Sequence, residues 1–179
     1  MSFFSDYLKD ISGHIQTVEM NQLESAVGMI RDCNQKKGKV IVAGNGGSAA
    51  LASHVTVDLT KNAGVRAINF NEADMITCFA NDFGYENWLT KALEFYADPQ
   101  DLVVLVSSSG KSPNMINAAN ACNRLNLKLL TFSGFDPENP LRTKGNLNFW
   151  VASKEYNFVE MTHHIWLLAI VDKLIEEIR

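Results

Sequence analysis

The stretch VIVAGNGGSAALAS, residues 40–53, decides how this chain is expected to fold. Its four leading apolar residues suit a buried parallel strand, and its alanine-rich end suits a helix. Between them lies the turn Gly44-Asn45-Gly46-Gly47-Ser48, which ends on a favourable N-cap residue. Such a turn can bind an anion, because free backbone N–H groups and the helix dipole both favour negative charge. An ordinary βα turn explains the same residues, and the spacing matches neither GxxxxGK[ST] nor GxGxxG, so a nucleotide is not the first interpretation.

A second strand-to-helix turn lies further along the chain. Residues 101–106 are nearly all apolar and predict a strand buried on both faces, and a helix is predicted from about 113 to 123. The turn between them carries four hydroxyl side chains, on Ser107, Ser108, Ser109 and Ser112. A helix cap would use only one or two of these hydroxyls, whereas phosphate oxygens can accept hydrogen bonds from all of them. We therefore expect this turn to bind phosphate.

Alternation of strands and helices predicts an α/β fold, a three-layer αβα sandwich around a five-stranded parallel sheet. The other strands are expected at 39–43, 66–70, 128–132 and 147–152, and the other core helices at 48–62, 72–80, 85–96 and 158–178. Residues 81–84 are expected to form a loop. In the last helix, the residues expected to pack inward are Ile165, Leu168, Ala169, Val171 and Ile175. Ligands of such sheets lie beyond the carboxyl ends of the strands, where both turns belong.

The chain is expected to form one domain, residues 1–179, with a helical arm at 1–37 and the αβα core at 38–179. Residues 3–36 contain no proline, and their apolar residues recur at helical spacing. We expect one or two helices there, with a break near Ser12-Gly13. Such an arm can pack against a partner subunit or against its own domain, and the sequence favours neither.

Composition excludes several classes of protein. Hydrophobic residues make up 46% and charged residues 20% of the chain, as in soluble globular proteins. A net charge of −4 makes a nucleic-acid partner unlikely on electrostatic grounds. No apolar run reaches the roughly 18 residues of a membrane span, and the N-terminus lacks a signal-peptide pattern. The widely spaced Cys33, Cys78 and Cys122 form no metal motif and suit a reducing compartment, so we expect a cytoplasmic protein.

Two pairs of a carboxylate and an imidazole could carry chemistry. His54 and Asp58 are four residues apart on one predicted helix, and Glu160 and His164 are four apart on another, so each pair shares a helix face. Together they could form a four-ligand metal site or a general acid–base set. The alternative for His54 and Asp58 is a hydrogen-bonded pair on a packed helix. Because adjacent helical residues point about 100° apart, at most one of His163 and His164 is expected to face the site.

Four motifs in this order resemble the sugar isomerase (SIS) domain family: GNGGSAAxAxH at 44–54, ANDFGYE at 80–86, SSSGKSPN at 107–114 and ExxHH at 160–164. Within that family they resemble the phosphoheptose isomerase branch and its relative, the DnaA initiator-associating protein. The resemblance implies a flavodoxin-like fold, a homotetramer and active sites built between subunits. The enzymes of this branch interconvert sedoheptulose 7-phosphate and glycero-manno-heptose 7-phosphate for surface polysaccharide, and several hold zinc.

The resemblance also assigns roles by position. The residues that it assigns to substrate binding are Asn45, Gly46, Gly47, Ser48, Asp82, Ser107, Ser108, Ser109 and Ser112. His54 matches a metal ligand, Asp58 replaces a glutamate that serves as base and metal ligand, and Glu160 replaces a glutamine. The largest departure is Leu168, which stands in place of a histidine that serves as acid and metal ligand.

His164 can compensate for Leu168, because it lies on nearly the same helix face, one turn nearer Glu160. We therefore predict a rearranged metal site, with zinc as the candidate ion, made of His54, Asp58, Glu160 and His164. In the enediol mechanism that the family implies, Asp58 or Glu160 is the expected base and His164 the expected acid. The competing hypothesis is a non-catalytic sugar-phosphate binder or scaffold like the initiator-associating protein. Loss of the distal histidine favours that hypothesis, and retention of the other polar residues favours the enzyme.

Overall fold

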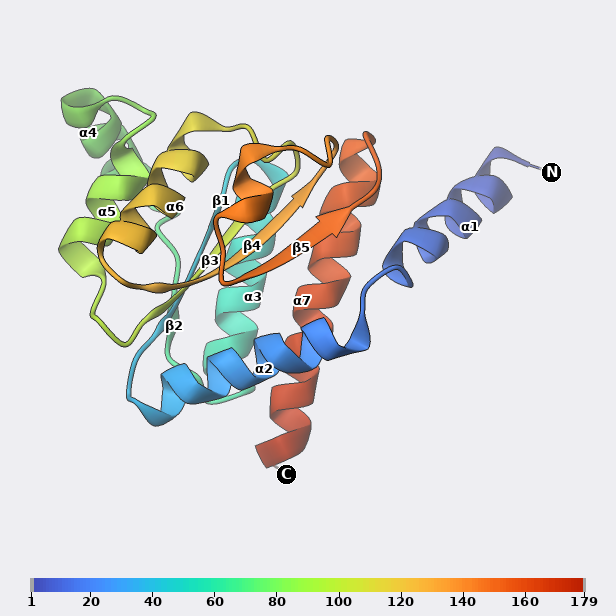
Figure 1. Cartoon of the computed structure of the whole chain (residues 1–179), viewed down its shortest axis with the longest axis horizontal. Coiled ribbons are helices and arrows are strands. Elements are labelled where there is room, and N and C mark those ends of the chain that lie inside the picture. The colour runs from blue at the N-terminus through green and yellow to red at the C-terminus, as the bar shows by residue number, and fades with distance from the viewer. Residues whose placement is uncertain (1, 179) are drawn as a thin grey trace.

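A sheet of five parallel strands forms the centre of the computed structural model, which describes residues 2–178 (Figure 1). The strands are β1 (Val40–Gly44), β2 (Ala67–Ile68), β3 (Leu102–Ser107), β4 (Lys128–Gly134) and β5 (Leu147–Val151). Their spatial order is β2-β1-β3-β4-β5, so β3 is central and neighbours β1. The strand expected at 66–70 shrinks to two residues. It lies at the sheet edge, where pairing with β1 covers only Ala67 and Ile68, and beyond it Asn71 donates its side-chain amide to the Ala49 carbonyl at 2.8 Å.

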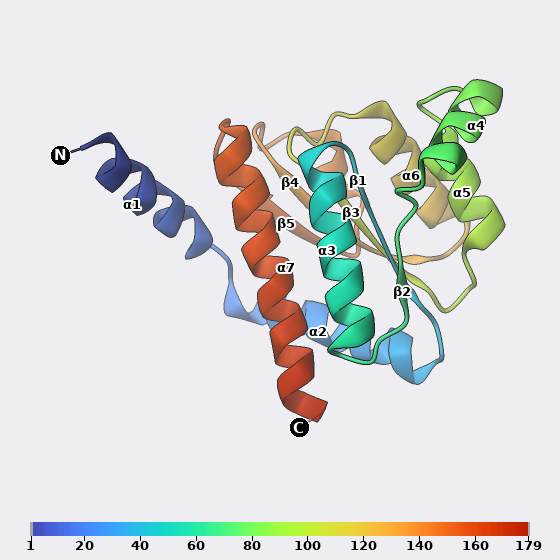
Figure 2. The same ribbon diagram turned by 180° about the vertical axis from the view of Figure 1, so that it is seen from behind.

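Helices cover both faces of the sheet, which confirms the three-layer architecture. They are α1 (Phe3–Ile15), α2 (Met20–Gln35), α3 (Gly47–Lys61), α4 (Ala73–Phe83), α5 (Trp88–Tyr96), α6 (Pro113–Arg124) and α7 (Tyr156–Ile178), with a 3-10 turn η1 (Pro140–Thr143). Figure 2 shows α3 and α7 side by side on one face, with α2 crossing below them, and α5 and α6 on the other. Alternate residues of β1 enter opposite cores, with Val40 and Val42 under α3 and Ile41 and Ala43 under α5 and α6.

The helical arm breaks later than expected. The break falls at residues 16–19, between α1 and α2, and Gly13 lies inside α1. Ser12 does not interrupt the helix, because its hydroxyl donates to the Leu8 carbonyl one turn back at 2.8 Å. The end of α1 touches its own domain, where Trp166 Nε1 donates to the Ile15 carbonyl at 2.8 Å. The beginning of α1 extends away from the core (Figures 1 and 2).

Two further expectations were wrong. Residues 81–83 are helical, because α4 continues to Phe83 and ends only at Gly84, whose φ is +83°. In α7 the inward face is shifted: Ile165 and Ala169 are exposed, while Trp166, Leu167 and Ile170 are buried. Apolar residues surround α7, so their periodicity alone could not select the buried face. Leu168 and Ile175 are half-buried against the core, and Val171 is buried as expected.

No helix in the described range of residues 2–178 is both long enough and apolar enough to span a membrane.

Candidate active site

The glycine turn and the serine turn open into one cavity of about 250 Å³ at the carboxyl ends of β1 and β3. They meet because β1 and β3 are adjacent, with Gly44 paired to Val106 at the end of the ladder. Tyr156 and Glu160, from the first turns of α7, complete the lining. Of the residues expected to bind substrate, all but Asp82 line this cavity. The topology thus places two helix N-termini, those of α3 and α6, around one small space.

The glycine turn presents backbone donors to this cavity. In the described part of the chain, the N–H groups of Gly46 and Gly47 donate to no protein acceptor, whereas the Ser48 N–H donates to the Asn45 carbonyl at 3.0 Å. Gly46 has a φ of +55°, a conformation that residues with a β-carbon rarely adopt. A β-carbon at Gly47 would overlap the Glu160 carboxylate. The backbone conformation therefore requires glycine at Gly46, a side chain at Gly47 would displace the Glu160 carboxylate, and the free N–H groups of both suit phosphate oxygens.

An amide pair joins the two turns. The Asn45 Nδ2 donates to Asn114 Oδ1 at 3.0 Å, and the Asn114 Nδ2 donates back to Asn45 Oδ1 at 2.9 Å. Asn114 follows Pro113 in the first turn of α6 and is 1% exposed. The Tyr85 hydroxyl also donates to Asn45 Oδ1, at 3.2 Å. Sequence reasoning missed Asn114, Tyr85 and Tyr156. Asn114 and Tyr85 each carried a signal, because they belong to the motifs SSSGKSPN and ANDFGYE, whereas Tyr156 carried none.

Glu160 brings a carboxylate into the cavity. The side chain is half-buried, lies over Gly47, and accepts a hydrogen bond from the Ser108 hydroxyl at 3.4 Å. A carboxylate beside an anion-binding turn repels the anion, because like charges repel more strongly where water is excluded. A carboxylate in this position could act as a general base toward a ligand in the cavity.

The other three predicted metal ligands form a chain on the outer side of α3 and α7. His164 Nε2 lies 2.9 Å from His54 Nδ1, and His54 Nε2 lies 3.3 Å from Asp58 Oδ2. Asp58 also accepts from the Asn62 amide at 3.0 Å. Partial burial, with His54 nearby, lowers the pKa of His164. Glu160 stands apart from this chain, and residues 2–178 hold no group of three or more His, Cys, Asp or Glu side chains arranged to bind a metal ion.

His54 and His164 offer two imidazole nitrogens, whereas zinc sites in proteins use three or four protein ligands. The two nitrogens are 2.9 Å apart and face each other, so both rings would have to turn for the nitrogens to converge on one ion. Asp58 contacts the far nitrogen of His54. It is therefore placed to orient that imidazole, as a carboxylate behind a metal-bound histidine does, and less well placed to bind the ion itself.

The two adjacent histidines of α7 have different environments. His163 is fully buried, and its Nε2 donates to the Ser133 carbonyl at 3.0 Å. Burial lowers the pKa of His163 to about 4, so the imidazole is neutral. Of the two, His164 is the one that turns toward α3, where it meets His54.

Asp82 lies outside the cavity of its own chain. It is exposed near the end of α4, where its carboxylate accepts from the Asn81 amide at 2.9 Å. The next residues along the chain do approach the cavity, through the Tyr85 hydroxyl. The structure thus leaves the predicted substrate role of Asp82 without a contact inside one chain.

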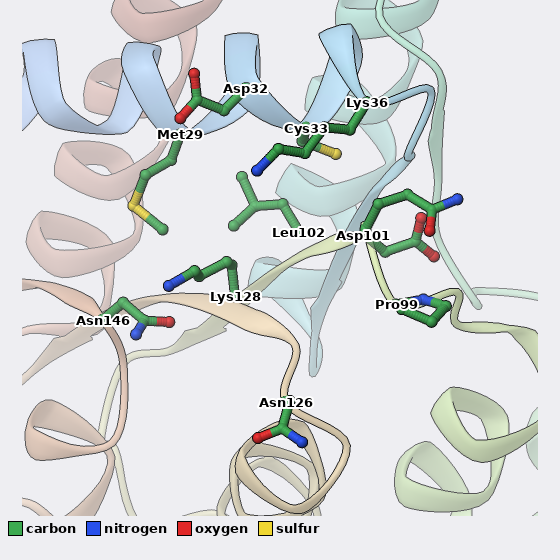
Figure 3. A pocket seen from close by; sticks show the side chains of 11 residues that line it. Met29, Asp32, Cys33, Lys36, Pro99, Asp101, Leu102, Asn126, Lys128 and Asn146 are labelled. Carbon is green, nitrogen blue, oxygen red and sulfur yellow. The ribbon is translucent and has the colours of Figure 1, made fainter.

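A larger cavity, of about 470 Å³, lies at the opposite ends of the strands, where β3 and β4 begin (Figure 3). Met29 and Lys36 line it from α2, Leu102 from the start of β3, and Lys128 from the start of β4. The helices that end near these strand ends, α2 and α6, present carbonyl groups there and so disfavour an anion. The smaller cavity, where the helix N-termini converge, is therefore the better candidate for an anion.

Known proteins resemble this chain over most of its length. The SIS domain family matches residues 3–134, which include both turns. The phosphoheptose isomerase of Syntrophotalea carbinolica is 26% identical, over 96% of this chain and 90% of its own length. That of Histophilus somni is 30% identical, over 73% of this chain and 69% of its own length. The structure of a phosphoheptose isomerase from Francisella tularensis superposes with a TM-score of 0.88 at 21% identity, covering 99% of this chain and all of the other.

The family match spans β1, β3 and β4 together with the two turns that line the cavity, and it stops before α7. The features on which the cavity depends are therefore the ones shared with the family, while Glu160 and His164 lie beyond the matched segment. This chain belongs to the SIS domain family.

Proposed function

We propose that this chain is a phosphosugar isomerase that interconverts a ketose phosphate and an aldose phosphate, with sedoheptulose 7-phosphate as its substrate. The observation that carries the proposal is the meeting of two anion-binding turns in one cavity, with the Glu160 carboxylate on its wall. Relatives that carry the name phosphoheptose isomerase support the choice of substrate.

The phosphate is anchored at the two turns. The Gly46 and Gly47 N–H groups and the serine hydroxyls donate to its oxygens, and the dipoles of α3 and α6 favour its negative charge. In a seven-carbon sugar the phosphate and the reacting carbonyl lie at opposite ends of the chain, so the bound sugar has to fold back to bring its reacting carbons to Glu160 beside the two turns. The binding energy of the phosphate serves to hold it in that conformation.

Glu160 is the base in this proposal. It removes the proton from the carbon beside the carbonyl, the electron pair forms the enediol double bond, and the carbonyl oxygen takes up a proton. The other enediol oxygen then loses its proton as the new carbonyl forms, and the former carbonyl carbon takes up a proton, which gives the isomeric sugar. Asp58 is less well placed, because its carboxylate already accepts from Asn62 and contacts His54, and it does not line the cavity. His164, one turn along α7 from Glu160, is the proposed acid, although like Asp58 it does not line the cavity and its Nε2 faces His54.

Zinc is part of the proposal, held by His54 and His164 with Asp58 orienting His54. When bound, the ion would polarise the substrate carbonyl as a Lewis acid. Elemental analysis of protein purified without chelator tests this part: about one zinc per chain is expected, and none in His54→Ala. Absence of metal from the wild type would remove zinc from the proposal.

The proposed assembly is a cytoplasmic homotetramer with sites shared between subunits. Phe3, Phe4 and Leu8 on α1 are 73%, 74% and 63% exposed in the single chain, and covering them by another copy would bury this apolar surface. Asp82 is exposed and lies outside its own cavity, so it is free to approach a neighbour's. Free cysteines suit a reducing compartment.

Turnover of sedoheptulose 7-phosphate by the wild type, Glu160→Gln and Asp58→Ala tests the function. The wild type is expected to form the aldose phosphate, Glu160→Gln to lose nearly all activity, and Asp58→Ala to retain more. Binding of the sugar phosphate without turnover by the wild type would instead identify a non-catalytic binder.

A further inference from the structure

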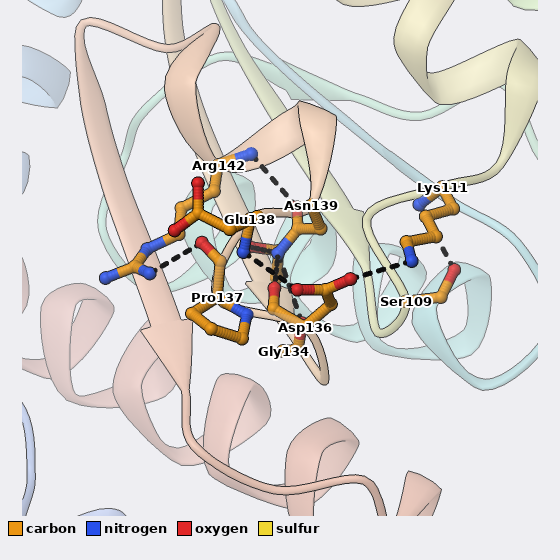
Figure 4. A network of polar contacts seen from close by, with 9 residues as sticks. Ser109, Lys111, Gly134, Asp136, Pro137, Glu138, Asn139 and Arg142 are labelled. Carbon is orange, nitrogen blue, oxygen red and sulfur yellow. Dashed lines mark hydrogen bonds and ion pairs between the residues drawn. The ribbon is translucent and has the colours of Figure 1, made fainter.

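Asn139 is a buried residue at the start of η1, directly behind the serine turn (Figure 4). Its amide nitrogen shares its hydrogens among the Ser133 hydroxyl at 3.2 Å, the Gly134 carbonyl at 3.1 Å and the Asp136 carbonyl at 2.8 Å. Its Oδ1 accepts from the Arg142 N–H at 3.1 Å and so caps η1. One side chain therefore fixes the whole segment 133–142, which we call the brace.

The brace holds the serine turn by its backbone. The Gly134 N–H donates to the Ser108 carbonyl at 2.9 Å, and the Leu141 N–H donates to the Gly110 carbonyl at 3.2 Å. Because a trans peptide directs its carbonyl and its N–H to opposite sides, the first contact turns the Ser109 N–H away from the brace. Among the described residues, no protein group accepts from the Ser109 N–H, and Ser109 lines the cavity. The brace thus frees a donor for phosphate.

Side chains reinforce the same junction. The Lys111 ammonium lies 2.9 Å from the Asp136 carboxylate, and the Lys111 N–H donates to the Ser109 hydroxyl oxygen at 3.2 Å. Gly110 has a φ of +63°, and a β-carbon there would overlap the Asn139 carboxamide. Gly110 and Asn139 therefore lie in direct contact, so the shape of the serine turn depends on the residue behind it.

We propose that Asn139 is a positioning residue for phosphate binding, which holds the serine turn in the conformation that presents its donors to the ligand. The identity of that ligand as a sugar phosphate rests on the proposed function. Asn139 touches no substrate in this role, and its effect passes through Gly110 and the Ser108 carbonyl. A brace that served stability alone would leave ligand affinity unchanged, so affinity is the deciding measurement.

Calorimetric titration of sedoheptulose 7-phosphate, and separately of inorganic phosphate, into Asn139→Ala tests the proposal. If the variant loses binding free energy equal to that of one net hydrogen bond, both ligands should bind about tenfold more weakly. Where turnover is measured, KM is expected to rise about tenfold while kcat stays within about twofold, since the carboxylate chemistry is untouched. Asn139→Ser, which keeps an oxygen to cap η1, is the second variant and is expected to weaken binding in the same way.

Asn146→Ala is the matched control. The Asn146 Oδ1 accepts from the Leu129 N–H at 2.9 Å near the start of β4, away from the serine turn, so this variant also loses a contact that fixes a turn. It is expected to lower the melting temperature and to leave both affinities at the wild-type values. Asn139 variants that fold and bind like Asn146→Ala would overturn the proposal.

Hydrogen exchange on the wild type gives an independent reading that needs no variant. Saturating phosphate is expected to slow exchange at the Gly134 and Leu141 N–H groups as well as within 107–112. Protection confined to 107–112 would overturn the proposal. A wild type that binds sugar phosphate without converting it defeats the enzyme assignment and leaves the Asn139 test intact. A wild type that binds neither ligand defeats both.

Discussion

Asn45 and Asn114 exchange a reciprocal pair of amide hydrogen bonds, at 3.0 and 2.9 Å, between residues 69 positions apart in the chain. The pair locks the glycine turn to the first turn of α6. The two anion-binding turns are consequently one preorganised site, and replacing either asparagine should alter the conformation of both turns.

Asn114→Ala tests this lock. The change leaves the partly buried Asn45 Nδ2 without an acceptor, and we expect the free energy of unfolding to fall by about 1–3 kcal/mol. Affinity for sedoheptulose 7-phosphate should fall as well. Asn123→Ala, an exposed asparagine on the same helix, is the control and should change neither quantity in urea unfolding and calorimetry. Unchanged affinity in a folded Asn114→Ala would show that the turns bind independently.

Glu160→Gln keeps the shape of the side chain and removes its charge. If Glu160 is the base, kcat for sedoheptulose 7-phosphate should fall about 100-fold or more. Affinity should hold or increase, because repulsion of the phosphate is relieved. Glu155→Gln, an exposed residue just before α7, serves as the control in the same steady-state assay. A kcat within a few-fold of wild type would transfer the role of base away from Glu160.

His163 should make stability depend on pH. Its pKa is lowered by burial from the ordinary value of 6.5 to about 4, so between these values the unfolded chain binds more protons than the folded one. The contribution is complete above pH 6.5 and is lost as the pH falls toward 4. About 2 kcal/mol should disappear between pH 6.5 and 5, at about 1.4 kcal/mol per unit. Urea unfolding across this range measures it, and a His163→Leu variant with the same pH slope as the wild type would contradict the assignment.

Phe4→Asp tests the assembly. The ring is 74% exposed in the single chain, so the change should cost the isolated subunit almost nothing while placing a charge in the proposed contact between subunits. Light scattering after size-exclusion chromatography should report smaller particles than for the wild type. Lys9→Ser, on the same helix, should leave the assembly intact. A wild type that is already monomeric would remove the tetramer from the proposal.

Local sequence signals were enough to predict the framework of the site. Residues 44–48 and 107–112 combine a strand, a turn composition and a helix start within a few positions, and the adjacency of β1 and β3 brings the two turns together. The parallel αβα architecture followed from the same alternation. The strands, turns and helix starts depend on neighbours in sequence, which is why they could be predicted, whereas the adjacency of β1 and β3 is seen only in the structure.

Features set by side-chain packing could not be predicted in this way. The choice between Trp166 and Ile165 as an inward residue depends on how α7 rolls against the sheet, since both are apolar. The contact of Asp58 with the far nitrogen of His54 depends on a ring orientation that spacing does not fix. Asn139 lies some thirty residues after the serine turn that it contacts, and no sequence motif marks it.

The most direct test of the central claim is a nuclear magnetic resonance spectrum of sedoheptulose 7-phosphate incubated with the wild-type protein in D₂O. An enediol mechanism in this cavity predicts that resonances of the aldose phosphate appear and that deuterium enters the carbon beside the carbonyl. A sugar phosphate that stays unchanged and free of deuterium, at enzyme concentrations where calorimetry shows it bound, would contradict the account.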